Sequence, residues 1–248
     1  MSDVVVKGLV LQCADYRESS RMLTVLTDRF GKISVSAKGA RRKNSRIAPS
    51  CQPFAFSEMV LNETRGRYYL SEASVIELFS GLANDIGNYS LGAYFLDLLN
   101  AACPEEDDMH ELLALGLNAL WLLCEGVKPR EQVKTVFELR LMLLLGYCPD
   151  IEACTVCGKE NPVEPILDLR GGNLYCRGCS VGKVEKPYRI DQTILHAMNY
   201  ISNSKSGKEF SFTLTEKPLK RLSMATELYI QEQLERNFST LDFYKQTK

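Results

Sequence analysis

Four cysteines in two short pairs are the residues of this chain best suited to chemistry. They are Cys154 and Cys157, in the sequence Cys-Thr-Val-Cys, and Cys176 and Cys179, in the sequence Cys-Arg-Gly-Cys. Two CxxC pairs supply four thiolates, which complete a tetrahedral shell around one zinc ion and leave no position open for a substrate. The pattern therefore predicts one structural zinc ion bound by all four.

The segment between the two pairs predicts a zinc ribbon. Ile166–Leu169 and Asn173–Tyr175 have the composition of short strands, and Arg170-Gly171-Gly172 between them is typical of a hairpin turn. Gly158 and Gly178 fall in the two cysteine turns, where a small residue lets backbone amides point at the sulfurs. A short hairpin between two cysteine pairs is the layout of a zinc ribbon.

Two other interpretations of the four cysteines are a pair of disulfides and a set of unrelated core thiols. Because Met1-Ser2-Asp3 leads directly into a strand pattern without a signal peptide, we expect a cytoplasmic, reducing location, which disfavours disulfides.

No other cysteine has a histidine nearby in the sequence, and the chain has only His110 and His196, so a catalytic thiol is disfavoured. The other cysteines are expected to be small core residues: Cys13, Cys51, Cys103, Cys124 and Cys148.

The charge of the chain is distributed unevenly, although the net charge of the 248 residues is −1. Residues 1–80 hold twelve basic and eight acidic side chains, whereas residues 81–129 hold one basic and eight acidic. Seven of the basic residues follow one another without an acidic residue between them: Arg29, Lys32, Lys38, Arg41, Arg42, Lys43 and Arg46. This run predicts a polyanion-binding segment, and the alternative is an ordinary solvated loop.

The elements around the basic run predict a β-barrel over residues 1–78. Five runs have the period and composition of strands: Val4–Cys13, Met22–Leu26, Ile33–Ala37, Phe54–Leu61 and Arg67–Ile76. Five short strands with a long third-to-fourth connection are typical of an OB-type barrel, which commonly binds single-stranded nucleic acid. Aromatic side chains on or beside these strands are candidates for stacking on bases, although some must fill the core: Tyr16, Phe54, Phe56, Tyr68 and Tyr69.

After the barrel the apolar period changes to that of helices, so the predicted fold class is α+β. We expect a helical domain in two parts, residues 79–150 and 188–248, with the zinc ribbon inserted at residues 151–187. The helix predicted from Arg130 to Leu145 is apolar over most of its circumference and should be buried on several sides. Further helices are expected over Asp191–Ile201 and from Pro218 to about Arg236. No apolar run reaches the length of a membrane-spanning helix.

Taken in order, the barrel, the ribbon and three short motifs resemble the RecO family of bacterial DNA repair proteins. The motifs are Lys38-Gly39-Ala40-Arg41-Arg42, Phe137-Glu138-Leu139-Arg140-Leu141 and Leu145-Gly146-Tyr147-Cys148-Pro149. The resemblance covers nearly the whole chain. No single motif is specific by itself, but their order is.

The resemblance implies a recombination mediator and not an enzyme. Such a protein would bind single- and double-stranded DNA, anneal complementary strands, engage the C-terminal tail of the single-strand binding protein SSB and, with RecR, help load RecA in a nucleoid-associated role. It implies that Lys38, Arg41 and Arg42 contact DNA and that the four paired cysteines bind zinc for structure. The same basic loop adds Lys43 and Arg46 as candidate contacts.

Other functions are kept as alternatives. A zinc-ribbon RNA- or transcription-associated binding module would use the same barrel and ribbon, and a purely structural interaction protein would bind no polyanion. A zinc deaminase is disfavoured because it needs an open ligand position and an H-x-E motif. The apolar stretches Leu91–Leu99 and Leu139–Leu145 would suit a groove for the SSB tail, but for any given residue a core position is the favoured alternative.

Overall fold

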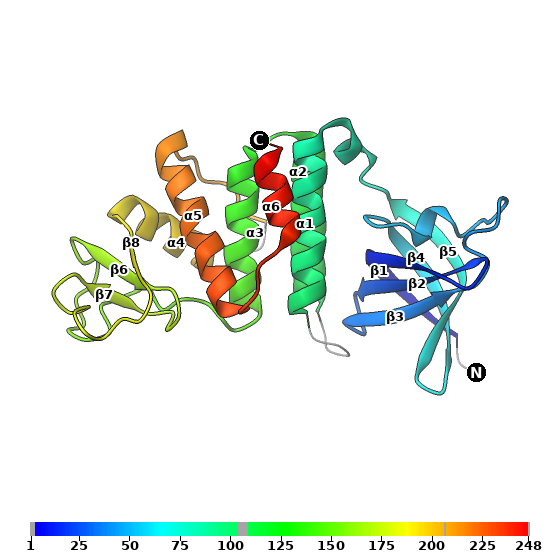
Figure 1. The fold of residues 1–248 in the computed structure, drawn as a ribbon, viewed down its shortest axis with the longest axis horizontal. Helices are drawn as coiled ribbons and strands as arrows, with labels where there is room; N and C mark the ends of the chain where they lie inside the picture. Colours follow the sequence, from blue (N-terminus) through cyan, green and yellow to red (C-terminus); the bar gives the residue numbers. More distant parts are fainter. Residues whose placement is uncertain (1–2, 104–108, 206, 248) are drawn as a thin grey trace. The chain divides into compact units, whose positions relative to one another are not determined.

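The computed structural model describes residues 3–103, 109–205 and 207–247 (Figure 1). Packing divides the chain into two compact units, Met1–Glu125 with Phe238–Lys248, and Gly126–Asn237. The domain boundaries expected from the sequence were placed where strands give way to helices or to the ribbon, whereas these units are defined by packing. The expected boundaries therefore stay a prediction. Among the described residues, no helix combines the length and the apolar character needed to span a membrane.

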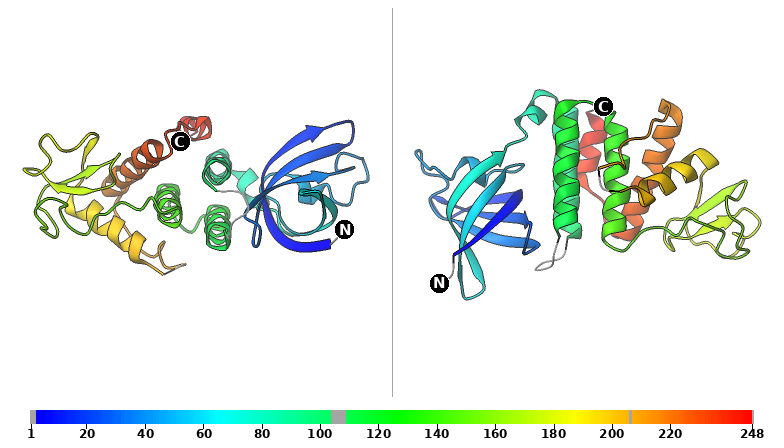
Figure 2. Two further views of the ribbon diagram at one scale, coloured as in Figure 1. Left: turned by 90° about the horizontal axis from the view of Figure 1, so that it is seen from below. Right: turned by 180° about the vertical axis from the view of Figure 1, so that it is seen from behind.

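The first unit contains a closed five-stranded barrel, as predicted (Figure 2). Its strands are β1 (Asp3–Tyr16), β2 (Ser20–Thr27), β3 (Lys32–Ala37), β4 (Phe56–Thr64) and β5 (Arg67–Glu77). Their order around the barrel is β1-β2-β3-β5-β4, and all pairs are antiparallel except β3 with β5, where Val35 lies opposite Tyr68 and Ser36 opposite Tyr69. Alternate side chains such as Val25, Val35 and Met59 fill the interior. The expected OB-type barrel is confirmed.

The long connection between β3 and β4 carries the last five residues of the basic run, from Lys38 to Arg46, and is tied to the barrel at both ends. Ala40 and Cys51 are buried in the barrel core, the latter in the short 3₁₀ helix η1 (Pro49–Cys51). The backbone amide of Arg41 donates to the carbonyl of Ser19 at 3.0 Å, which joins the connection to the turn between β1 and β2. These anchors hold the basic side chains of the connection on a fixed part of the barrel surface.

Three helices complete the first unit: α1 (Ile86–Ala102), α2 (His110–Glu125) and α6 (Ser239–Gln246), with the 3₁₀ helix η2 (Ser80–Asn84) before α1. Helix α6 was not predicted from the sequence. It is only eight residues long, too short to form alone, and it packs on α1. The hydroxyl of Thr240 in α6 donates to the carboxylate of Asp97 in α1 at 2.9 Å. The ring of Phe238, just before α6, has its centroid 5.8 Å from that of Tyr94 in α1.

The leucines of α1 are core residues. Leu91, Leu98 and Leu99 are fully buried, so they form no exposed groove in this structure. In the second unit, Leu139 and Leu141 are likewise buried. The core interpretation of these side chains is therefore the one that the structure supports.

The second unit consists of three helices and the cysteine ribbon. The helices are α3 (Arg130–Leu144), α4 (Gln192–Asn203) and α5 (Glu216–Gln233), and α3 packs on both others. Helix α3 is buried on several sides, as expected, and its buried residues include the charged Lys134 and Glu138. The ribbon is a sheet of order β7-β6-β8, formed by β6 (Pro165–Asp168), β7 (Leu174–Cys176) and β8 (Pro187–Arg189). The predicted hairpin is β6 and β7, whereas β8, which pairs with β6, was not predicted.

Candidate metal centre and nucleic-acid interface

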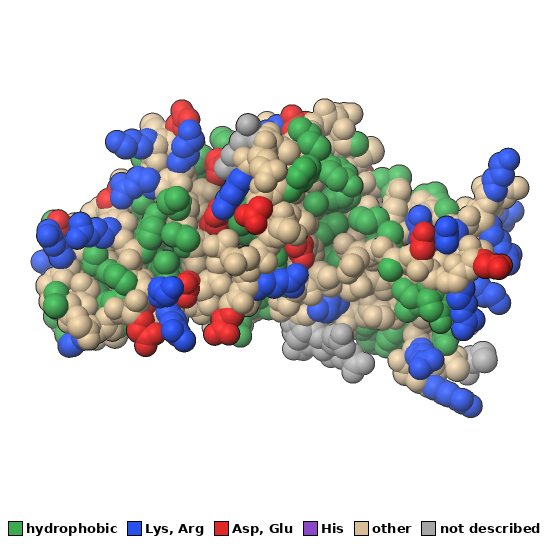
Figure 3. Space-filling model, viewed as in Figure 1, with side chains coloured by type: hydrophobic (Ala, Val, Ile, Leu, Met, Phe, Trp, Pro, Cys, Tyr) green, Lys and Arg blue, Asp and Glu red, His purple; other side chains and the backbone are tan. Residues whose placement is uncertain are grey.

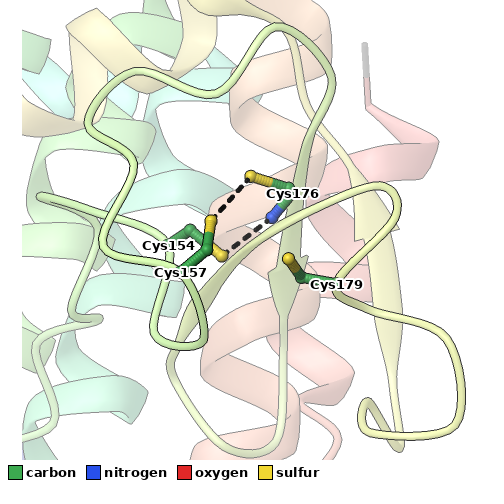
Figure 4. A group of neighbouring side chains, drawn as sticks. All are labelled: Cys154, Cys157, Cys176 and Cys179. Atoms are coloured by element: carbon green, nitrogen blue, oxygen red, sulfur yellow. Dashed lines mark hydrogen bonds between the residues drawn. The ribbon is translucent and has the colours of Figure 1, made fainter.

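The structure brings the four paired cysteines together at one end of the ribbon (Figure 4). The potential ligand atoms of Cys154, Cys157, Cys176 and Cys179 all lie within 4.8 Å of one another, and the sulfurs of Cys157 and Cys176 are 3.6 Å apart. A tetrahedral shell with metal–sulfur bonds of about 2.3 Å places its sulfurs about 3.8 Å apart. The residues present therefore fit one four-coordinate metal ion, and a shell of four protein ligands leaves no position for a substrate.

Backbone amides favour the thiolate form of Cys154. The amide of Cys176 donates to the sulfur of Cys154 at 3.3 Å (Figure 4). Burial raises the pKa of the Cys154 thiol, but hydrogen bonds from the amides of Cys157, Cys176 and Val156 outweigh burial and lower that pKa to about 6. Gly158 adopts a left-handed φ of 68°, a conformation that glycine adopts readily in turns, whereas Gly178 does not adopt a left-handed φ.

Helix α5 holds the ribbon in place through its C-terminal half. The hydroxyl of Tyr229 donates to the carbonyl of Tyr147 at 2.7 Å, just before the first cysteine pair. The side-chain amide of Gln233 donates to the carbonyls of Leu169 and Arg170, at the hairpin turn. The four-cysteine cluster therefore lies on a ribbon whose hairpin turn is fixed to helix α5.

The five remaining cysteines lie apart from the cluster. Cys51 and Cys103 are buried, and burial raises the pKa of their thiols to about 11 and about 12. Cys13, Cys124 and Cys148 are half-buried. A buried thiol with a raised pKa is a poor nucleophile, in keeping with the prediction that these cysteines serve as packing residues.

The barrel carries a groove of about 1040 Å³ beside the parallel pair of β3 and β5. Its walls come from the turn between β1 and β2, from β3 and from the start of β5, and basic side chains line it: Arg17, Lys32, Lys38 and Arg67. Figure 3 shows Lys and Arg side chains gathered over one end of the barrel. The groove therefore presents positive charge to a ligand that could lie along the strands.

Two of the tyrosines that line the groove have exposed rings. Tyr16 is 42% exposed and Tyr69 is 40% exposed, and the guanidinium of Arg17 lies 5.1 Å from the Tyr16 ring centre. Tyr68 also lines the groove but is half-buried and stacks on Phe30. Phe54 is buried with a left-handed φ of 70°, so it belongs to the packing and not to the surface. The structure thus selects Tyr16 and Tyr69 from the five aromatic candidates as the available stacking surfaces.

A second, smaller hollow lies beside the groove on the same barrel. We call it the arginine cup, and it has a volume of about 500 Å³ and is lined by Arg21, Ala40, Arg41, Arg42, Ala48, Pro49 and Gln52. The guanidinium of Arg21 donates to the carbonyl of Cys51 at 3.2 Å, which fixes its direction. Three guanidinium groups around one hollow form a surface for phosphate groups.

The structure divides the five basic residues predicted from the sequence. Lys38 lines the groove, Arg41 and Arg42 line the cup, and Lys43 and Arg46 are exposed on the connection but line neither hollow. Sequence reasoning missed Arg17, Arg21 and Arg67, because they lie outside the acid-free run. Only the pairing of the strands brings them next to it.

The fold and the two sites define an OB-barrel protein that carries a separate ribbon, whose four cysteines are placed as they would be around a metal ion. Residues 1–79 match the family described as "Recombination protein O N terminal", and residues 83–242 match "Recombination protein O C terminal". The chain therefore belongs to the RecO family of DNA repair proteins.

Similar proteins include a "DNA repair protein RecO" of Acetivibrio thermocellus, 31% identical over 99% of this chain and 97% of the relative. A protein of the same description from Caldicellulosiruptor bescii is 30% identical over 99% of both chains. One from Exiguobacterium sibiricum is 36% identical over 69% of this chain and 68% of the relative.

Proposed function

We propose that this protein is a recombination mediator that binds single- and double-stranded DNA and anneals complementary strands. The observation that carries the proposal is the basic groove with two exposed tyrosines on an OB-type barrel. Cations neutralise phosphates without reading sequence, and exposed rings stack on any base. Membership of a family of DNA repair proteins supports the same conclusion.

The proposal includes partners and excludes covalent chemistry. The proposed partners are RecR, the C-terminal tail of SSB and, indirectly, RecA. They are proposed because the order of the sequence motifs resembles that of the RecO family. The protein would act by binding and positioning strands, with no catalytic residue. The metal is proposed to be one zinc ion, because a set of four thiolates is the usual structural zinc shell.

The test is the annealing of two complementary oligonucleotides, one of them coated with SSB, across a series of salt concentrations. We expect the protein to accelerate annealing and the acceleration to fade as salt rises, because phosphate contacts release counterions. If the folded, metal-loaded protein gives no acceleration at low salt and binds RNA as well as DNA, the zinc-ribbon RNA- or transcription-associated module becomes the better function.

Reversing one charge in each hollow is expected to remove most DNA binding. Lys38→Glu with Arg42→Glu eliminates two exposed phosphate contacts, one in the groove and one in the cup. At about 1.5 kcal/mol for each charged hydrogen bond, each hollow should lose roughly tenfold in affinity. DNA that occupies both hollows should therefore bind roughly 100-fold more weakly, with a salt slope smaller by about 1.4. Fluorescence anisotropy across a salt series measures both.

The matched control is Lys183→Glu with Arg189→Glu, which makes the same charge change at exposed residues of the second unit. This control should shift DNA affinity far less, and both variants should keep the wild-type circular dichroism spectrum. A Lys38→Glu, Arg42→Glu protein that binds DNA with wild-type affinity at moderate salt would remove the basic connection from the mechanism.

Removing the two exposed rings should weaken binding in a different way. Tyr16→Ala with Tyr69→Ala eliminates two stacking surfaces, and at about 1 kcal/mol for each ring the affinity for single strands should fall roughly 30-fold. The salt slope should stay at its wild-type value, because no cation is lost. Phe243→Ala, which removes an exposed ring from α6, is the control and should have no effect. Unchanged affinity in the double variant would show that bases do not stack in the groove.

A further inference from the structure

The groove and the arginine cup are separate hollows with a common wall. Residues 16–20 line the groove and Arg21 lines the cup, while Lys38 lines the groove and residues 40–42 line the cup. The wall is the contact between these two segments. In that contact the backbone amide of Arg41 donates to the carbonyl of Ser19. The guanidinium of Arg41 lies 3.5 Å from the carbonyl oxygens of Arg17 and Glu18.

The two hollows differ in the ligand groups that they can bind. The groove offers tyrosine rings together with cations, which suits a strand whose bases lie against the protein. The residues that line the cup include three arginines but no aromatic residue, which suits phosphate groups alone. A strand held only by its phosphates keeps its bases free to pair.

An acidic side chain of the barrel already binds two of these arginines. One carboxylate oxygen of Asp15 lies 3.5 Å from Nε of Arg21, and the other lies 3.4 Å from Nε of Arg41. A phosphodiester presents two unbridged oxygens to arginines in the same way. Since the Asp15 side chain is 57% exposed, it can turn away into water when another anion arrives.

We propose that the arginine cup is a second, phosphate-only site, which holds a second strand while the groove holds the first, and that an incoming phosphate displaces Asp15. The proposal rests on the proposed function, because it needs a first strand in the groove. It gives one barrel the means to hold two strands side by side. Asp15 is then a positioning residue that keeps Arg21 and Arg41 directed into the cup until DNA arrives.

The test uses thymidine oligonucleotides, which cannot pair with each other, and the full-length protein. Native mass spectrometry counts the strands bound to one protein chain, and anisotropy gives the affinities for the first and the second strand. We expect complexes of one chain with two strands. Arg42→Glu should reduce the second-strand affinity at least tenfold more than the first-strand affinity.

Asp15→Asn provides the sharper test, because it removes the carboxylate that competes with phosphate for the arginines and keeps the shape of the side chain. Second-strand affinity should rise roughly fivefold, the factor expected from the loss of two competing exposed ion pairs. Glu72→Gln makes the same charge change at an exposed residue of β5 that lines neither hollow, and it should leave the ratio of the two affinities unchanged.

The outcomes separate this inference from the proposed function. If no strand binds at all, the proposed function fails and the inference fails with it. If one strand binds but a second never joins the same chain, or if Asp15→Asn and Glu72→Gln behave alike, the proposed function stands and the second site is refuted. Equal losses of both affinities in Arg42→Glu would refute it too, because they would indicate one continuous site.

Discussion

Replacing Cys157 by serine is expected to release the metal and to unfold the ribbon while the barrel stays folded. Cys157 is exposed, so its substitution changes the metal shell with little change in packing. Zinc binding to small four-ligand sites provides about 10–16 kcal/mol of apparent free energy, far more than three short strands can supply by themselves. Elemental analysis should find about one zinc ion per wild-type chain and almost none in the variant.

Limited trypsin digestion reports the unfolding directly, because Lys159, Arg170, Arg177 and Lys183 lie within the ribbon. These sites should be cut quickly in Cys157→Ser and slowly in the wild type. Cys148→Ser, a half-buried cysteine of the same unit outside the cluster, is the control and should keep the metal. Single-strand binding should persist in both variants, since the groove belongs to the other unit. A Cys157→Ser protein with a full complement of zinc would rule out the four-thiolate shell.

Replacing Lys134 by methionine is expected to destabilise the second unit by about 3–5 kcal/mol, because it removes the ammonium that is paired with the buried carboxylate of Glu138. Lys134 is 1% exposed and Glu138 is fully buried. The ammonium lies 3.0 Å from Glu138, 3.2 Å from Glu227 and 3.2 Å from the hydroxyl of Ser223. Urea unfolding, followed by a probe in the second unit, measures the loss.

Two further variants test this explanation. Lys220→Ala breaks an ion pair with Glu216 of the same four-residue spacing, but both partners are exposed, so stability should hardly change. Lys134→Met with Glu138→Leu removes the buried pair together and should recover most of the loss. In that variant Thr226 keeps its bond to the carbonyl of Ser223, and Ser223 keeps its bond to Glu131. If the single and the double variant were equally unstable, an unpaired charge would not be the cause.

The contribution of Lys134 should also depend on pH. Burial lowers the pKa of Lys134, but Glu138 and Glu227 outweigh burial and raise that pKa above its ordinary value of 10.5. A group whose pKa is raised by folding stabilises the protein fully below the pKa of the unfolded chain, and this stabilisation is lost as pH rises through the folded value. The difference in unfolding free energy between wild type and Lys134→Met should therefore be constant near neutral pH and shrink above pH 10.5. A difference that stays constant in strong alkali would contradict this assignment.

The local patterns of the chain predicted much of the fold. Alternating apolar residues such as Ile33 and Val35 identified the barrel strands, because every second side chain of a barrel strand faces the core. Elements without a period of their own were missed. Strand β8 and helix α6 are short, and pairing with β6 and packing on α1 stabilise them. The buried charge of Lys134 gave no signal either, because its partners Ser223 and Glu227 lie on a helix about 90 residues later.

The sequence by itself determined the four-cysteine cluster and the basic character of the barrel. CxxC spacing alone brings two sulfurs of a turn together, and an acid-free run such as Lys38 to Arg46 is positive in any conformation. The tertiary structure decided which side chains share a surface. Closure of the barrel placed Tyr16 and Tyr69 in one groove, and contact between the β1–β2 turn and the basic connection joined Arg21 to Arg41 through Asp15. Such contacts depend on pairing between distant strands, which no local pattern encodes.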